Sequence, residues 1–338
     1  MKKFILTVFT ICLILGVGVA LIYRGYDNFL DTPADPNDSE RLITEIDPGA
    51  STSNVIEKLS EAKLITNKTY FKYFITLEGY DTEIKAGKYV LTRNLTPIEI
   101  IEKLTNPAET ELAITIPEGY KVTDIDNLLA ESNLIERGDF IDCVKNCEFP
   151  DYDFLDQSKL PELYPLEGFL YPDTYFVNGS TFSIQSFIQR LLDNFDNKLN
   201  AKMIADINNQ NKDMQEIIIM ASIIEREVHT NDDLPIVSGI LWKRYENDWM
   251  IGADATLLYE KDNNEINYED LQSQSPYNTR KNKGLPPGPI CNPGIKSIKA
   301  AIYPEESEYW FYLTTLDTGE VIYAVSNEEH EENKTNYL

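Results

Sequence analysis

Histidine is scarce in this sequence, with only His229 and His330 among 338 residues. A zinc site would have few imidazole ligands to draw on, so we expect no metal centre. Basic charge is also in short supply: 30 lysines and arginines face 56 aspartates and glutamates, and the net charge is −26. A protein that binds nucleic acid or an anionic lipid surface needs a basic face, so the sequence argues against both as partners.

Apolar residues are not lacking, since they make up 42% of the chain and include many of its 20 tyrosines and 14 phenylalanines. This apolar content is sufficient to form hydrophobic cores, so the high negative charge does not indicate a disordered chain. The length is sufficient for two or three domains. A neutral or sugar-like substrate, met by tyrosine and tryptophan faces, suits this composition.

Only four cysteines occur, and two of them, Cys143 and Cys147, are spaced C-x3-C. Cys12 lies inside an N-terminal apolar run and does not follow a lipobox, while Cys291 is isolated. A local disulfide between Cys143 and Cys147 requires that this segment lie outside the cytoplasm. The sequence leaves this pairing open.

Residues 4–23 form an apolar run of 20 residues without a charge, directly after Lys2 and Lys3. A helix of this length matches a bilayer core of about 30 Å, and the leading lysines favour a cytoplasmic N-terminus. A cleaved signal peptide is the alternative, but the run is long for one and the residues after it offer a poor cleavage site. We expect a cytoplasmic tail at 1–3, an uncleaved single-pass anchor in the cell membrane, and an extracytoplasmic chain after Arg24.

Beyond the anchor, residues 24–40 are acidic and contain two prolines, which is typical of a solvated linker. Residues 41–110 alternate between strand and helix patterns and predict a small α/β module. A shift of 70 residues repeats its pattern, because Gly49 falls on Gly119 and Leu64 falls on Leu134, which indicates a related strand–turn–helix unit.

Residues 111–338 predict a mixed α/β domain, with an irregular acidic connector or insertion at 139–165. The whole chain is therefore expected to be α+β, with one N-terminal transmembrane helix, a small module and a larger C-terminal domain.

The stretch from Met214 to Val228 contains no glycine or proline and predicts a mostly buried helix. On a helical wheel Glu225 lies with the apolar stripe, whereas Glu216 and Glu227 fall on roughly the opposite side and reach water. A carboxylate held against apolar groups loses hydration and stays protonated to higher pH, so it can serve as a general acid. The alternative is a structural glutamate paired with an arginine or lysine, which is common.

Two further stretches carry candidate binding residues. The segment LEGFLYPDTYFVNG (166–179) places Glu167 and Asp173 among aromatic residues such as Tyr171, a combination that suits either a sugar subsite or a strand entering the core. Residues 275–294 form a loop with five prolines and three glycines, which has little backbone entropy left to lose on binding. The loop is expected to be functional, with a rigid connector as the alternative.

Six segments resemble, in their order along the chain, the endolytic murein transglycosylases, the YceG-like proteins. They are LEGFLYPDTY, ASIIEREV, GADATLLY, SPYNT, KGLPPGPICNPG and the terminal EH…NK. The resemblance covers essentially the whole chain. It implies a membrane-anchored enzyme that cuts nascent peptidoglycan strands internally, with a module similar to LysM before the catalytic domain, peptidoglycan synthases as possible partners, and no cofactor.

The resemblance also implies the site residues. The family's catalytic glutamate falls on Glu225, which would act as the single general acid and base and leave 1,6-anhydro-MurNAc ends. The substrate-binding candidates in the matching motifs are Glu167, Tyr171, Asp173, Ser222, Asp254, Thr256, Ser275, Tyr277, Asn278 and Asn292. Two features depart from the family pattern: the terminal EHEENK, which puts a role for His330 in doubt, and the C-x3-C pair.

Two rival functions stay open. An ordinary muramidase would use Glu225 as acid and either Asp254 or Glu167 as base. A membrane-anchored scaffold would bind peptidoglycan without cutting it; an idle buried carboxylate, which costs stability, speaks against it.

Overall fold

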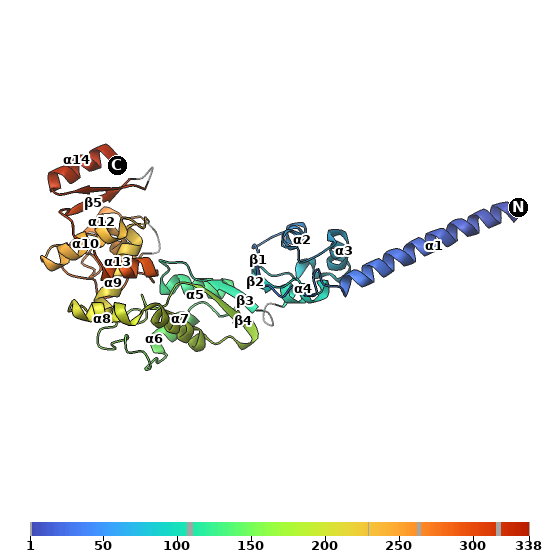
Figure 1. Cartoon of the computed structure of the whole chain (residues 1–338), viewed down its shortest axis with the longest axis horizontal. Helices are drawn as coiled ribbons and strands as arrows, with labels where there is room; N and C mark the ends of the chain where they lie inside the picture. The colour runs from blue at the N-terminus through green and yellow to red at the C-terminus, as the bar shows by residue number, and fades with distance from the viewer. Residues whose placement is uncertain (1, 107–110, 229, 262–264, 316–318, 338) are drawn as a thin grey trace. The chain divides into compact units, whose positions relative to one another are not determined.

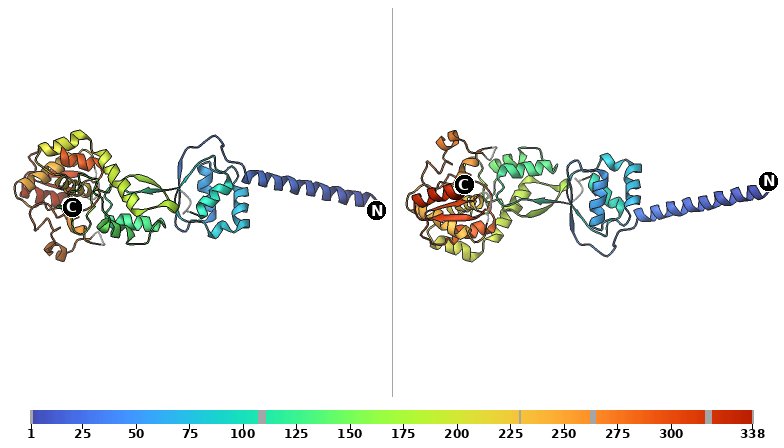
Figure 2. Two further views of the ribbon diagram at one scale, coloured as in Figure 1. Left: turned by 90° about the horizontal axis from the view of Figure 1, so that it is seen from below. Right: turned by 90° about the horizontal axis from the view of Figure 1, so that it is seen from above.

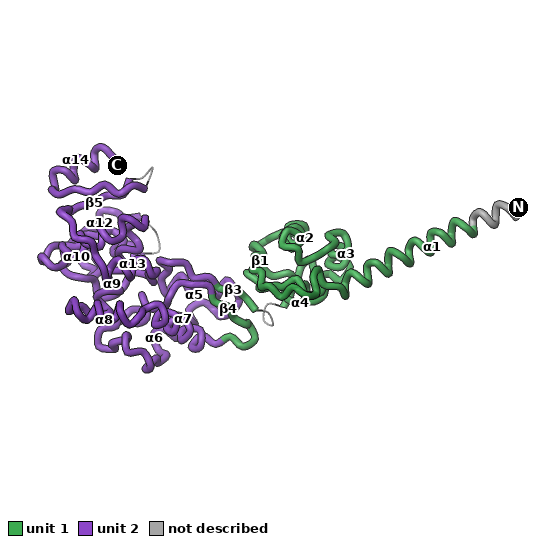
Figure 3. Tube along the Cα trace, viewed as in Figure 1, with its two compact units in different colours: residues 1–114, 175–182 green, residues 115–174, 183–338 purple. Residues whose placement is uncertain are grey.

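The computed structural model describes residues 2–106, 111–228, 230–261, 265–315 and 319–337 (Figure 1). Contacts between residues divide the chain into two compact units (Figure 3). Unit 1 comprises residues 1–114 and 175–182, and unit 2 comprises residues 115–174 and 183–338. The fold is mixed α/β, with an apolar helix at the N-terminus.

The N-terminal helix α1 (Lys2–Leu30) is long and apolar enough to cross a membrane, over the stretch Phe9–Leu30. It continues beyond Tyr23, where the sequence predicted the end of the anchor, so the segment expected to be a linker begins as helix. The last turn of α1 packs on the rest of unit 1, because Phe29 is buried against the rings of Tyr70 and Phe71.

The rest of the expected linker also lies against unit 1. The Arg93 guanidinium donates to Asp38 at 2.7 Å and to the Ala62 carbonyl at 3.1 Å. The backbone N–H of Asp35 donates to the Arg93 carbonyl. These contacts fix residues that the sequence indicated as a solvated tether.

Unit 1 contains a four-stranded sheet in the order β1-β2-β3-β4, whose first three strands are antiparallel neighbours. Its strands are β1 (Leu42–Ile46), β2 (Gly87–Leu91), β3 (Glu111–Thr115) and β4 (Thr174–Asn178). Its other helices are α2 (Thr52–Glu61), α3 (Lys68–Glu78) and α4 (Pro97–Thr105). Helix α4 begins at a capping box, in which the side chains of Thr96 and Glu99 each accept a hydrogen bond from the other residue's backbone N–H.

The repeat predicted by the 70-residue shift is confirmed by local backbone geometry. Gly49 and Gly119 both have positive φ, at 73° and 82°, before helices of equal length. At the other end, Lys63 and Asn133 are both left-handed, at 57° and 56°, which few non-glycine residues adopt. Helix α2 and its counterpart α5 therefore start and stop in the same way.

Unit 2 is built mainly from helices. They are α5 (Val122–Glu131), α6 (Asp139–Asn146), α7 (Ile184–Lys198), α8 (Ala201–Asn209), α9 (Met214–Glu227), α10 (Leu234–Glu246), α11 (Asp254–Leu258), α12 (Tyr268–Gln272), α13 (Ile295–Ile302) and α14 (Asn327–Tyr337). Helix α9 packs against α10, α11 and α13 (Figure 1). Its residues from Ile217 to Ile224 are all buried, which makes it the central helix of the unit.

The region 139–165 is only partly irregular. Its first residues form α6, because Phe140 and Val144 bury on one face, and the carboxylate of Asp126 accepts from the N–H groups of Gly138 and Phe140 at the start of the helix. Cys143 and Cys147 form a disulfide at the end of α6. The prediction that this connector or insertion is irregular is therefore wrong for the residues of α6.

Near the C-terminus, strands β5 (Phe311–Thr314) and β6 (Val321–Ala324) form an antiparallel hairpin. Residues 316–318, between the two strands, lie outside the described residues. Helix α14 packs on both strands, and Figure 2 shows it in red beside the hairpin.

Candidate active site

Glu225 lies in the last turn of α9, where the buried core of unit 2 meets its surface. The helix starts at a capping box formed by Asp213 and Glu216 and ends at Glu227. Glu225 is half-buried, and its Oε2 accepts a hydrogen bond of 3.0 Å from the backbone N–H of Gly294. A carboxylate at this position is anchored by one oxygen and keeps access to solvent.

A second carboxylate, that of Glu118, lies next to Gly294 as well, close to Glu225. A Cβ on Gly294 would lie only 1.9 Å from Oε1 of Glu118, so the absence of a side chain there makes room for the carboxylate. Partial desolvation and the negative charge of Glu225 raise the pKa of the exposed Glu118, and Lys296 opposes the shift. Glu118 and Glu225 therefore form a pair of neighbouring acids.

The turn that carries Glu118 is fixed by its neighbours. Gly119 donates to the Asn292 carbonyl at 2.9 Å, and the Asn292 N–H donates to the Tyr120 carbonyl at 2.8 Å. The positive φ of Gly119 and its missing Cβ bring the turn next to Glu225, whose Cγ would lie 3.8 Å from such a Cβ. Glu118 is not among the site residues predicted from the sequence. The available signal was the repeat, in which Glu118 falls on Pro48, so the acid occurs in only one of the two copies.

Glu167 and Asn292 support this turn from the interior, where both are fully buried. Glu167 accepts from the Val122 N–H, the Tyr259 hydroxyl and the Asn292 Nδ2. The Oδ1 of Asn292 accepts from the N–H groups of Gly168 and Leu170 at 2.9 Å. Burial raises the pKa of Glu167 to about 8, although these donors oppose the shift. The network joins three distant segments behind the acidic pair.

Ser222 and Tyr171 are also buried beside the pair. Ser222 Oγ accepts from the Ile290 N–H at 3.0 Å and donates to the Ile219 carbonyl, which fastens the 290–294 segment to α9. Desolvation, followed by the charges of Glu118 and Asp173, raises the pKa of Tyr171 to about 12. Asp173 itself accepts from Asn194 at 3.1 Å and contacts Lys198.

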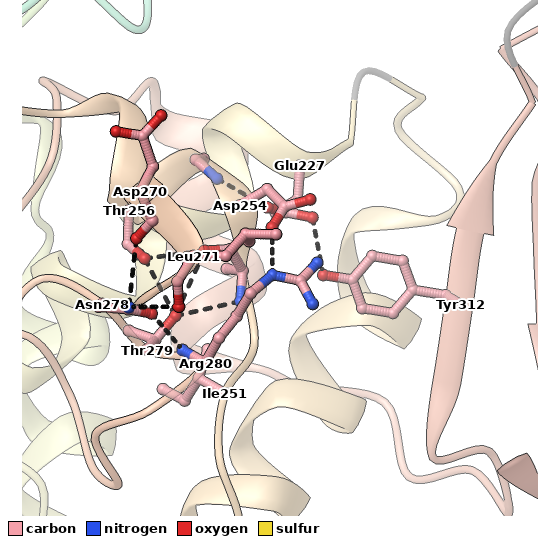
Figure 4. Close-up of polar contacts among 12 residues, drawn as sticks. Glu227, Ile251, Asp254, Thr256, Asp270, Leu271, Asn278, Thr279, Arg280 and Tyr312 are labelled. Carbon is pink, nitrogen blue, oxygen red and sulfur yellow. Dashed lines mark hydrogen bonds and ion pairs between the residues drawn. The ribbon is translucent and has the colours of Figure 1, made fainter. Parts of the chain in front are cut away.

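The remaining sequence candidates form a second group around the start of the 275–294 loop. Thr256 and Asn278 are buried and bond to backbone carbonyls, and Asn278 Nδ2 donates to Ser273 at 2.9 Å. Ser275 accepts from the Tyr277 N–H, and the Tyr277 ring packs on Tyr259 with centroids 4.9 Å apart. These side chains are shown in part in Figure 4.

Asp254 differs from that group because it is half exposed. Its carboxylate pairs with Arg280, and Figure 4 shows the Arg280 guanidinium between Asp254 and Tyr312. The Tyr312 hydroxyl donates to Glu227 at 3.0 Å, and desolvation raises the pKa of Glu227. The wheel prediction that Glu227 faces water therefore holds only in part, because β5 and α11 half-bury this side chain.

Two hollows open beside the end of α9. The Glu118 pocket, about 600 Å³, is lined by the Glu118–Lys121 turn, α5, Tyr259 and Lys261. The Trp249 pocket, about 620 Å³, is lined by Trp249, Arg280, Phe311 and residues of α14 including His330. Arg226, Ala255 and Leu258 line both pockets, so the two are adjoining parts of one surface. Within the described residues, no group of three metal-ligating side chains occurs.

Comparison with known proteins places this arrangement in a family. Residues 44–336 match the YceG-like family, and the chain belongs to that family. A crystal structure of a YceG-like protein from Listeria monocytogenes is similar, with a TM-score of 0.68 and 29% identity over 87% of this chain and 98% of that one.

Two curated relatives are named endolytic murein transglycosylase. The one from Bacillus subtilis is 29% identical over 93% of this chain and 89% of its own length. The one from Streptococcus pneumoniae serotype 2 is 27% identical over all of this chain, which spans 65% of that relative's length.

Proposed function

We propose that this protein is an endolytic murein transglycosylase, which cuts the MurNAc–GlcNAc bond within peptidoglycan strands. The names of relatives that match most of the chain support the activity. The observation that carries the chemistry is the half-buried Glu225 at the end of α9, held by Gly294 and facing Glu118 beside an open pocket.

In the first step, Glu225 acts as general acid and gives its proton to the glycosidic oxygen as the bond from that oxygen to C1 of MurNAc breaks. Positive charge develops at the anomeric carbon. In the second step the ionised Glu225 takes the proton of the C6 hydroxyl, whose oxygen bonds to C1 and closes the 1,6-anhydro ring. The proton returns to Glu225, and neither water nor a cofactor is consumed.

Glu118 supplies a second carboxylate beside the general acid Glu225. Partial desolvation and the charge of Glu225 raise the pKa of Glu118, so the two acids interact. When Glu225 is protonated for the first step, an ionised Glu118 also stabilises the positive anomeric carbon. The buried Glu167 and Asn292 act as positioning residues, because their hydrogen bonds hold the Glu118 turn and the Gly294 segment together.

The test replaces Glu225 with glutamine in the full-length protein. We expect Glu225→Gln to fold normally, bind glycan strands and lose at least about 10²-fold in cleavage. Mass spectrometry of the wild-type products should find ends lighter by one water than hydrolytic ends. Hydrolytic ends would identify a muramidase, for which Glu118 is a better-placed base than the buried Glu167 or the ion-paired Asp254. A zymogram without any clearing would support the scaffold.

The location and organisation follow from the same proposal. Helix α1 anchors the chain in the cytoplasmic membrane, and the rest lies outside, where the Cys143–Cys147 disulfide can persist. Residues 41–110 form a module similar to LysM that binds glycan, and residues 111–338 form the catalytic domain. Peptidoglycan synthases that deliver new strands at the membrane are the partners that this placement suits.

A further inference from the structure

The Trp249 pocket is rich in positive charge although the protein is strongly acidic. Four cationic side chains line it (Arg226, Arg244, Arg280 and Lys334), against the two carboxylates of Glu227 and Asp254. The whole chain, by contrast, has a net charge of −26. A local excess of cations on an acidic protein marks a place where an anion is favoured.

Three of these cations have partners within the protein. Arg244 is half-buried, and its guanidinium donates to the carbonyls of Ile251 and Trp310. Arg280 is held by Asp254, with nearly half of its side chain exposed. Lys334 pairs with Glu331 on its own helix.

Arg226 is the exception. It is exposed and makes no hydrogen bond or ion pair with any residue in the described part of the chain. Its guanidinium extends to the Glu118 turn, because Nη1 would lie 3.8 Å from a Cβ on Gly119, next to Glu225. An anion bound by Arg226 therefore lies directly beside the carboxylate pair, at the junction of the two pockets.

Aromatic side chains also line this pocket, among them Trp249, Phe311 and Tyr312. Trp249 is 42% exposed, and its ring lies 5.0 Å from Trp310 and 5.6 Å from Phe311, measured between centroids. An apolar wall next to a free guanidinium suits a ligand with both aliphatic groups and a carboxylate, rather than a bare inorganic anion.

We propose that the Trp249 pocket binds the peptide attached to the MurNAc residue beside the cut bond, with Arg226 and Arg280 recognising a peptide carboxylate. The proposal rests on the proposed function and adds a specificity subsite to it. The sugars next to the bond carry hydroxyl and amide groups, whereas the attached peptide supplies the carboxylates. An arginine binds a carboxylate through two parallel hydrogen bonds, which fixes orientation as well as charge. Asp254 then acts as a positioning residue that aims Arg280 into the pocket.

Binding is measured with full-length Glu225→Gln protein in detergent, so that cleavage does not interfere. Two probes are used: uncrosslinked peptidoglycan strands with their peptides intact, and the same strands whose carboxylates are converted to amides. We expect Arg226→Gln, added to Glu225→Gln, to weaken binding of the intact strands about 10-fold or more and to leave binding of the amidated strands unchanged. The matched control is Arg190→Gln, since Arg190 is an exposed arginine of unit 2 that lines neither pocket; it should change neither binding constant.

Equal weakening on both probes would assign Arg226 to the sugar backbone and overturn the proposal, as would no effect on either. This binding result does not depend on whether the protein cuts glycan strands. If the protein distinguishes the two probes through Arg226 but its wild-type form cuts neither, the subsite proposal stands and the proposed activity is wrong.

Discussion

Gly294 is the residue on which the geometry of the acidic pair depends most directly. Its backbone N–H holds Glu225, and its missing side chain leaves room for Glu118. Its φ is −76°, so alanine fits the backbone, and the three atoms nearest to an added Cβ all belong to Glu118. We expect Gly294→Ala to reduce cleavage, because the Glu118 carboxylate must move, and to cost at most about 1 kcal/mol in the free energy of unfolding, because Glu118 is exposed and flexible.

A double-mutant cycle checks this cause. In a Glu118→Ala background the collision partner is gone, so Gly294→Ala should then cost almost nothing in urea unfolding. An unchanged cost in that background would show that the destabilisation comes from another neighbour.

Glu167 gives a prediction about pH. Its pKa is about 8 in the folded protein, above the ordinary value of 4.5. The folded state therefore binds more protons than the unfolded state between these values, and the free energy of unfolding falls as pH rises from about 4.5 to about 8. The slope is at most about 1.4 kcal/mol per pH unit. Urea unfolding at several pH values should show that Glu167→Gln loses this contribution, and an identical slope in both proteins would contradict it.

At the scale of an element, the disulfide at the end of α6 makes its own contribution. It closes a very short loop, for which chain entropy predicts a stabilisation of about 2 kcal/mol. Dithiothreitol should lower the free energy of unfolding by about this amount and leave the Cys143→Ala/Cys147→Ala protein unaffected. The double-alanine protein still contains the buried, free Cys291, so it controls for any effect of dithiothreitol that does not come from the disulfide.

The element most accurately predicted from the sequence is α9, because fourteen residues without glycine or proline, and a capping box, specify a helix by local signals alone. Its environment could not be predicted in the same way. The wheel separates Glu225 from Glu227 by about 200°, so it places them on opposite sides of the helix, but Tyr312 and α11 approach from the side that the wheel treats as solvent. How far each side of α9 is buried depends on segments that lie far away in the sequence.

Glu118 shows the same limit at the site. It lies more than a hundred residues from Glu225, and only the turn geometry of Gly119 and the clamp of Asn292 bring the two acids together. Several polar residues of the matching motifs, such as Glu167 and Asn278, turn out to be buried and bonded to the backbone. Motif order indicates that such residues matter, but it does not distinguish a group that touches substrate from one that supports the fold.

For the whole molecule, the attachment of α1 gives a further prediction. A variant that lacks residues 2–23 keeps Phe29, so its packing on Tyr70 and Phe71 is preserved. We expect this protein to move from the membrane pellet to the soluble fraction and to cleave isolated strands at the wild-type rate. Continued sedimentation with membranes would show that another part of the chain binds them.

The burial of Phe29 has a geometric consequence. A flexible linker after a membrane helix would let the first module move over a wide range of distances from the bilayer. Here the last turn of α1 itself packs on Tyr70 and Phe71, so almost no flexible chain separates the helix from that module. Under the proposed function, which places α1 in the bilayer, that module is confined to a thin layer next to the lipid headgroups. We then expect it to reach only the glycan strands that lie within this layer.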